Sequence, residues 1–117
     1  MSHFRTLRTK LTDAEILKSS LQELGIFVNT NADVRGFNGQ KVKADIVAVL
    51  EGGHDLGWKR NANGSFDMIA DLSGVAKTHD QAELITALNQ KYAVKQTLAQ
   101  VKQLGLKNAS VKLVLQQ

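Results

Sequence analysis

Side chains that could do chemistry concentrate in residues 51–71, EGGHDLGWKRNANGSFDMIAD. This stretch holds the only tryptophan, one of three histidines and four acidic residues. Glu51, His54, Asp55 and Asp71 offer oxygen and imidazole ligands, but their spacing matches no recognised metal motif. His79 precedes an expected helix, where a surface histidine near the cap is a simpler interpretation than a catalytic acid or base. We therefore predict no metal site here.

Covalent and cofactor chemistry have no evident agent in the sequence. The chain has no cysteine, and no serine or lysine lies in a nucleophile motif. The Gly-rich segment GFNG, from Gly36, lacks the lysine and the following helix of a phosphate-binding loop, and no dinucleotide fingerprint is present. We predict no cofactor and name no catalytic residue. Whether the chain is an enzyme stays uncertain, with a non-catalytic role favoured.

The elements that position these residues indicate an α+β fold, one domain over residues 1–117. Thr12 and Glu15 form a capping-box pair, and Gly25 ends the helix that follows. Asp80 begins a second helix. Its apolar residues change from one face of the helix to another along the segment, which predicts a break near residues 91–93. Strands are expected at residues 3–11, 26–30, 32–37, 41–51 and 110–115, and on both sides of Asn63-Gly64. This order predicts an antiparallel meander with helices on one face, in a version that resembles ferredoxin-like folds.

Two-residue turns at Gly52-Gly53 and Asn63-Gly64 would fix the registers of the central strands. They predict one row of Val47, Trp58 and Ile69, and a second row of Asp45, Arg60 and Asp67. In the second row the guanidinium lies between two carboxylates, which favours a cross-strand ion-pair row over a ligand clamp. The opposite face is more continuously apolar and is assigned to the helices, with Gly57 at its centre.

The Trp58 face is then too apolar to meet water, so it needs a cover. Three alternatives stay open: another segment of this chain, a second copy, or a different protein. Tryptophan and arginine are frequent anchors of protein interfaces. We therefore predict a partner-binding site formed by Trp58, Val47, Leu56, Ile69 and Arg60.

Charge is distributed unevenly along the chain, whose formal net charge is +4. Residues 1–12 carry +3 and residues 84–117 carry +5, without an acid in either segment, while the middle carries −4. If the two ends lie together, one side of the protein would attract anions, including nucleic acid. The alternative is that these side chains are solvated and serve solubility. The predicted anion-binding residues are Arg5, Arg8, Lys95, Lys102 and Lys107.

Four segments together resemble a known family: SHFRTLRTKLTD, ADVRGFNGQKVKADIVAVLEG, HDLGWKRNANGSFDMIADLSGVAK and KYAVKQTL. The chain is similar to the hypothetical chloroplast reading frame thirty-five proteins of cyanobacteria and red-lineage plastids. The resemblance implies a cyanobacterial cytoplasm or a plastid stroma. It implies no activity and no catalytic residue, because none is established for the family.

The leading hypothesis is a small soluble, non-catalytic protein that binds a protein partner or itself, as an assembly or regulatory factor. No apolar run is long enough to span a membrane, and the N-terminus does not read as a secretory signal. One alternative is a nucleic-acid-associated regulator that uses the basic terminal segments. A second alternative is a small-ligand-binding protein or an enzyme.

Overall fold

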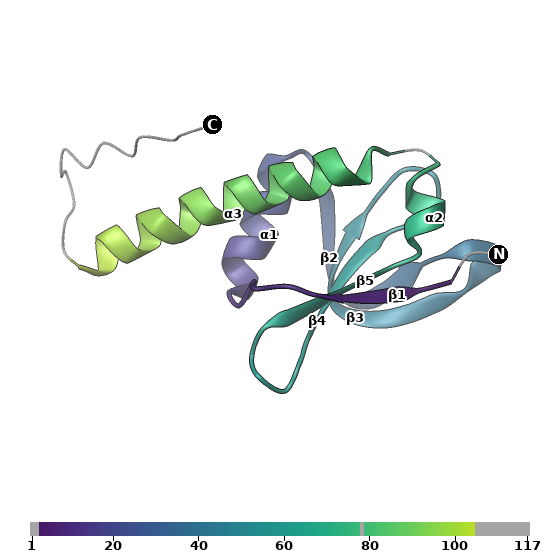
Figure 1. Ribbon diagram of the computed structural model, residues 1–117, viewed down its shortest axis with the longest axis horizontal. Helices are drawn as coiled ribbons and strands as arrows, with labels where there is room; N and C mark the ends of the chain where they lie inside the picture. Colours follow the sequence, from purple (N-terminus) through teal and green to yellow (C-terminus); the bar gives the residue numbers. More distant parts are fainter. Residues whose placement is uncertain (1–2, 78, 105–117) are drawn as a thin grey trace.

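One five-stranded antiparallel sheet, with helices against one of its faces, forms the body of the protein (Figure 1). The computed structural model describes residues 3–77 and 79–104. The predicted α+β fold is confirmed, and β2 to β5 form the predicted meander. The elements are β1 (Arg5–Arg8), α1 (Ala14–Glu23), β2 (Phe27–Arg35), η1 (Phe37–Gly39), β3 (Lys41–Val49), β4 (Leu56–Arg60), β5 (Phe66–Ala70), α2 (Leu72–Val75) and α3 (Gln81–Gln103).

The sheet has the strand order β1-β5-β4-β3-β2. The N-terminal strand therefore takes an edge, where it pairs with β5 from Arg5↔Ala70 to Arg8↔Asp67. The two strands predicted at residues 26–30 and 32–37 are one strand, β2, which passes through Asn31 at a φ of 47°. The strand predicted at residues 110–115 lies outside the described residues, so the ferredoxin-like arrangement stays a prediction.

Helix α1 is amphipathic, as the spacing of its leucines predicts. Leu17 and Leu21 are fully buried, and Gly25 follows the helix at a φ of +79°. The predicted cap at Thr12 is wrong by one residue, because the Asp13 carboxylate accepts the hydrogen bond from the Ile16 N–H at 3.0 Å. The backbone N–H groups of Thr12 and Asp13 both donate to the Tyr92 hydroxyl, which joins the start of α1 to α3.

Helix α3 is continuous, so the predicted break at residues 91–93 is wrong. Its start agrees with the prediction, because Asp80 accepts a hydrogen bond from the Glu83 N–H. The segment contains no glycine or proline and is rich in alanine, leucine, glutamine and lysine, which all favour a helix. Its C-terminal half projects beyond the sheet (Figure 1), so apolar residues there have no need to face the sheet.

The predicted strand registers are also wrong, by one residue at each hairpin. Trp58 pairs with Ile46 and Met68 instead of Val47 and Ile69. The connection between β3 and β4 spans residues 50–55, and the next hairpin closes through a three-residue loop ending in Gly64 at a φ of +91°. Because alternate residues of a strand point to opposite faces, the slip moves Trp58 to the face that the helices cover.

The main core lies between the sheet and the helices, where Trp58 and Leu56 pack with residues of β3 and β5 that include Ile46, Ala48, Phe66 and Met68. A smaller cluster of Val34, Ala44 and Val47 lies on the opposite side. Gly57 belongs to this smaller cluster, because a Cβ atom there would lie 2.2 Å from the Val34 Cγ2 atom. The glycine therefore admits a valine of β2, and the prediction that it admits a helix is wrong.

Candidate functional site

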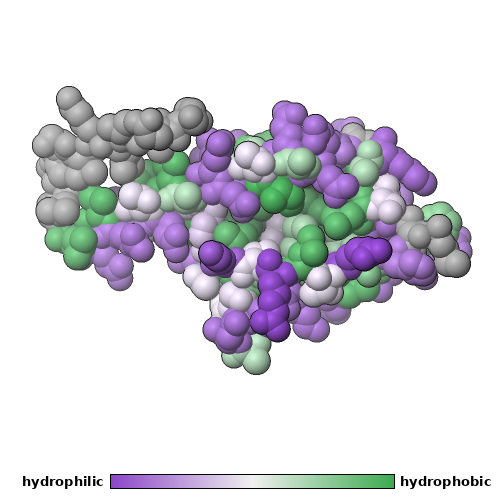
Figure 2. Space-filling view, viewed as in Figure 1, coloured by the Kyte–Doolittle hydropathy of each residue, from purple (hydrophilic) through white to green (hydrophobic). Residues whose placement is uncertain are grey.

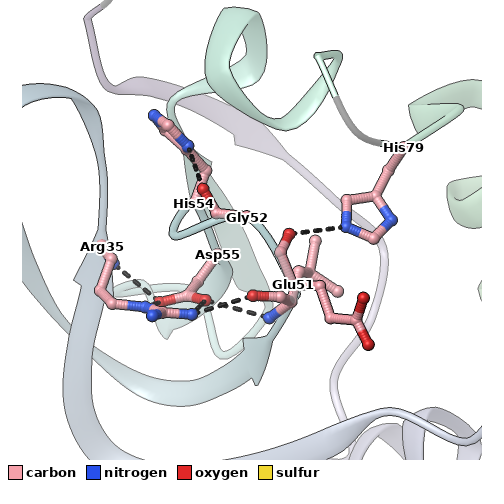
Figure 3. Close-up of polar contacts among 7 residues, drawn as sticks. Arg35, Glu51, Gly52, His54, Asp55 and His79 are labelled. Atoms are coloured by element: carbon pink, nitrogen blue, oxygen red, sulfur yellow. Dashed lines mark hydrogen bonds and ion pairs between the residues drawn. The ribbon is translucent and has the colours of Figure 1, made fainter.

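The loop between β3 and β4 holds a buried carboxylate that accepts hydrogen bonds from the end of β2 and from the start of the loop itself (Figure 3). Asp55 is 1% exposed and accepts hydrogen bonds from Arg35 Nε at 2.8 Å and Nη2 at 2.9 Å. It also accepts the backbone N–H groups of Arg35 and Leu50, each at 3.0 Å. Burial opposes the charge of Asp55, but these hydrogen bonds and the guanidinium outweigh it, so its pKa lies below its usual value.

The same hydrogen bonds raise the pKa of Arg35, so both members of the pair are charged at neutral pH. Arg35 Nη2 also donates to the Leu50 carbonyl at 2.9 Å. The pair therefore holds the end of β2 against both ends of the loop. Both carboxylate oxygens of Asp55 accept hydrogen bonds from Arg35 or Leu50, which indicates a structural role.

The other candidate ligands around this loop are directed elsewhere. Asp71 is 1% exposed and accepts the backbone N–H groups of Phe37 and Gly74. His54 contacts the Gly52 carbonyl through Nδ1, and His79 contacts the Glu51 carbonyl through Nε2 (Figure 3). The His54 Nε2 atom lies 3.9 Å from Asp71 without a hydrogen bond. Across residues 3–77 and 79–104, no group of three or more His, Cys, Asp or Glu residues could hold a metal ion.

The predicted partner-binding residues do not form one surface. Trp58 is 1% exposed and Leu56 is fully buried, both under the helices, whereas Val47 and Ile69 are buried on the opposite face. The cover of Trp58 thus comes from the chain itself, one of the three alternatives. The role of these residues in binding a partner stays a prediction, and in this structure their side chains are occupied with one another and with the core.

Arg60, the remaining member of that set, is exposed but engaged. Its guanidinium donates to the carbonyls of Thr12 at 2.9 Å and Gly64 at 2.5 Å, and lies 4.2 Å from the centre of the Phe66 ring. The predicted ion-pair row is wrong, because Asp45 accepts the backbone N–H of Arg60 and Asp67 accepts from the Asn61 side chain. Arg60 therefore fastens the β4–β5 hairpin to the start of α1.

The predicted anion-binding residues divide between two places. Arg5 and Arg8 are exposed on β1, at the edge of the sheet. Lys95 lies on the side of α3 that faces α1, where it forms an ion pair with Glu23, and Lys102 is exposed near the end of α3. Lys107 lies outside the described residues. Arg8 and Lys95 thus lie on different sides of α3, and anion binding by the predicted residues stays a prediction.

A groove between β1 and α3, here called the β1–α3 groove, is one of those that the described residues form along α3. Its volume is about 430 Å³, within the range of ligand sites in proteins. Figure 2 shows apolar surface gathered in this position, between α3 and the strands below it. Arg8 and Lys10 lie at its margin, and none of the described residues that line it is acidic. Its apolar lining consists mainly of Leu7, Trp58, Met68, Ile85, Leu88 and Tyr92.

The second groove, the α1–α3 groove, lies on the other side of α3 and has a volume of about 450 Å³. Leu24, Val94 and Leu98 give it an apolar lining, and Glu23 of α1 reaches across to Lys91 and Lys95 of α3. The hydrogen bond from Lys95 is the main cause that holds the pKa of Glu23 below its usual value. Neither groove was predicted, since each depends on how α3 crosses the sheet and α1.

Comparisons with known proteins identify the family of the chain but assign no function to either groove. Residues 20–113 match the family described as "Protein of unknown function (DUF1257)". The chain belongs to this family. An uncharacterised protein, ycf35, from Guillardia theta is 30% identical over 99% of the chain and 97% of its own length. A ycf35 protein from Pyropia yezoensis is 27% identical, with the same coverage. No solved structure matches the chain.

The comparisons confirm the predicted resemblance and supply no activity for the DUF1257 family. In the part of the chain that the structure describes, no helix is both long enough and apolar enough to cross a membrane.

Proposed function

We propose that the protein is a non-catalytic protein-binding factor, and that its β1–α3 groove receives an acidic segment of a partner protein that also carries apolar side chains. A role in assembly or regulation belongs to the same proposal. So does a location in a cyanobacterial cytoplasm or a plastid stroma, which the resemblance to the chloroplast reading-frame proteins supports. The observation that carries the proposal is an apolar groove with a basic margin.

The apolar lining supports a binding role because it is accessible at its edge. Leu7 is 45% exposed on an edge strand, whereas Trp58 and Leu88 behind it are buried and form a firm floor. A segment that covers Leu7 would remove its apolar surface from water, which contributes about 25 cal/mol per Å². Buried aromatic and aliphatic groups beside a polar margin are the usual arrangement of a protein-binding site.

The margin of the groove supports an acidic occupant. Arg8 and Lys10 would attract carboxylates, and no acid lies among the described residues of the lining. Asp67 is the cross-strand neighbour of Arg8, but it lies outside the lining and accepts a hydrogen bond from the Asn61 side chain. Residues 105–117 of the chain itself contain Lys107 and Lys112 and no acid, so their charge is a poor match for this margin. Nucleic acid is also a weaker match, because binding to single strands uses aromatic rings on which bases can stack. The aromatic rings of the groove, Trp58 and Tyr92, are buried.

The test is affinity capture from a phototrophic host with the native chain and two matched variants. Arg8→Ala/Lys10→Ala removes the basic margin, and Lys41→Ala/Lys77→Ala removes two exposed lysines that line neither groove. We expect the first variant to lose a captured protein that the native chain and the control retain. The captured protein should contain an acidic segment with apolar residues, and the segment alone should bind the native chain.

Three results would contradict the proposal. The first is equal capture by all three proteins, and the second is retention of nucleic acid alone, with a steep dependence on salt. The third is partner capture that is lost when residues 105–117 are deleted but retained by Arg8→Ala/Lys10→Ala, which would assign the binding site to these residues instead of the groove. Thermal unfolding of each variant, measured alongside, separates loss of binding from loss of folding.

A further inference from the structure

The projecting half of α3 carries an apolar seam outside the face that packs on the core. Val94, Leu98 and Val101 follow one another at intervals of four and three residues, which places them on one face of the helix. Leu88 and Tyr92, which face the core, lie on average about 130° away around the helix axis, at about 100° per residue. Leu98 is 47% exposed, and Figure 2 shows apolar surface at this end of the helix.

The spacing of the seam is typical of a helix that packs against another helix. Ala87 and Lys91 continue the intervals of four and three towards the N-terminus, as in the heptads of coiled coils. The α1–α3 groove runs along the same residues, with Leu24 at the end of α1 forming its other wall. The seam shares Val94 and Leu98 with this groove. From residue 87 to residue 101 the helix extends about 21 Å, at about 1.5 Å per residue, which is about four turns.

Beside this surface, a single acidic side chain forms ion pairs with two lysines. Glu23 lies 3.6 Å from the Lys91 Nζ atom and also pairs with Lys95. Lys102 continues the row along the seam, and α3 has no acidic residue after Glu83. Because its pKa is lowered, Glu23 is ionised at neutral pH. The surface therefore has more basic than acidic groups even with Glu23 in place.

We propose that this surface docks an amphipathic helix of a partner protein, and that acidic residues of the helix displace Glu23 from Lys91 and Lys95. Its apolar side chains cover Val94, Leu98 and Val101. The site goes beyond the proposed function, because it lies on the other side of α3 from the β1–α3 groove and is carried by different residues. In a symmetric pair of chains, an α3 laid against this surface would bring a lysine row against a lysine row, so charge favours the acidic helix over a second copy.

The test uses two synthetic helical peptides of about three heptads, both with leucine at the core positions. One peptide has glutamate beside the core, and the other has lysine at the same positions. Fluorescence anisotropy of the labelled peptides measures their binding to the full chain and its variants. We expect the native chain to bind the glutamate peptide and to bind the lysine peptide far more weakly.

Two variants then identify the surface. Glu23→Gln leaves both lysines without an internal acid, and we expect it to bind the glutamate peptide about 3-fold or more tightly than the native chain does. Leu98→Ser should bind that peptide about 10-fold more weakly, since it removes the exposed centre of the seam. Lys41→Ala/Lys77→Ala should bind it as the native chain does. Circular dichroism of each variant establishes that it is folded.

The sign of the Glu23→Gln effect decides between the two occupants. If two copies of the chain associate through this surface, Glu23→Gln leaves the lysines of both copies without an acidic partner and should weaken the dimer. Sedimentation would then show a dimer of the native chain that dissociates more readily in the variant. That result, equal binding of the two peptides, or no effect of Leu98→Ser would overturn the proposal. The two variants change Glu23 and Leu98, which do not line the β1–α3 groove, so failure of this proposal would leave that groove unaffected.

Discussion

Gly57 gives the sharpest test of the register that places Trp58 in the core. A methyl group added by Gly57→Ala would lie 2.2 Å from Val34 Cγ2 and 3.0 Å from the Ala44 Cβ atom. Val34 is fully buried and β-branched, so it cannot turn its methyl group away at low cost. Overpacking of this kind costs about 1–3 kcal/mol, and the lower entropy of unfolded alanine offsets about 0.4–1 kcal/mol of it. We expect a net loss of about 1–2 kcal/mol in the free energy of unfolding.

The double variant shows whether Val34 is the cause. Val34→Ala alone should cost about 2–3 kcal/mol, because two buried methyl groups are lost and a small cavity remains. In that background Gly57→Ala no longer meets Cγ2 and fills part of the cavity, so most of its cost should disappear, while the 3.0 Å contact with the Ala44 Cβ atom remains. The expected coupling energy is therefore about 1–2 kcal/mol.

Urea unfolding, followed by the fluorescence of the only tryptophan and by circular dichroism, measures these values. Val28→Ala is the matched control, since Val28 also lies in β2 but packs against the main core. Gly57→Ala should cost the same with and without the Val28 change. Additive costs for the Val34 pair, within about 0.5 kcal/mol, would refute the register, because they would mean that Val34 does not lie over Gly57.

Two further predictions concern the core and the loop. Trp58→Ala should lower the free energy of unfolding by about 3–5 kcal/mol, as for other large buried side chains, and a loss below about 1 kcal/mol in urea unfolding would contradict its burial. Because the pKa of Asp55 is lowered by folding, the stability that its charge contributes is present above the ordinary aspartate pKa of about 3.9 and is lost as pH falls through the lower, folded value. Urea unfolding across this acidic range should show a smaller decline for Asp55→Asn than for the native chain, and equal declines would contradict the assignment.

The elements that were predicted well are those set by local patterns. The leucines of α1, the cap at Asp80 and the glycine after α1 each depend on residues within about one turn of helix. The apolar alternation of β3 and β5 correctly assigned Ile46 and Met68 to the helix-covered face. These short-range signals were enough for the α+β meander and its edge strand.

The errors arise where a distant residue decides the local geometry. Two glycines after Glu51 favour a tight turn, yet Asp55 is drawn to Arg35, twenty positions earlier in the chain, and the loop lengthens to satisfy that pair. The observed register differs from the predicted one by one residue. Leu56 and Trp58 therefore both lie on the helix-covered face instead of the opposite face. The break predicted in α3 assumes that the apolar residues before residue 91 and those after residue 93 must all face the sheet. In the structure the second set lies on the half of α3 that projects beyond the sheet.

The candidate sites were the least predictable part. Arg8 and Lys10 were recognised as basic, but their place beside Leu7 and the floor formed by Trp58 depends on the path of α3. Lys95 was predicted to bind an anion, and its nearest anion in the structure is Glu23 of the same chain. Such a pairing between two helices leaves no periodic signal in the sequence.

Photo-crosslinking from the β1–α3 groove tests the central claim most directly. A photoreactive amino acid replaces Leu7 in the full chain expressed in a phototrophic host, and the same amino acid at Lys41 serves as the control. The account predicts a crosslink from position 7 to an acidic segment of another protein, absent from position 41 and weakened by Arg8→Ala/Lys10→Ala. Crosslinks from position 7 only to residues 105–117 of the chain, only to nucleic acid, or to the same proteins as from position 41 would contradict it.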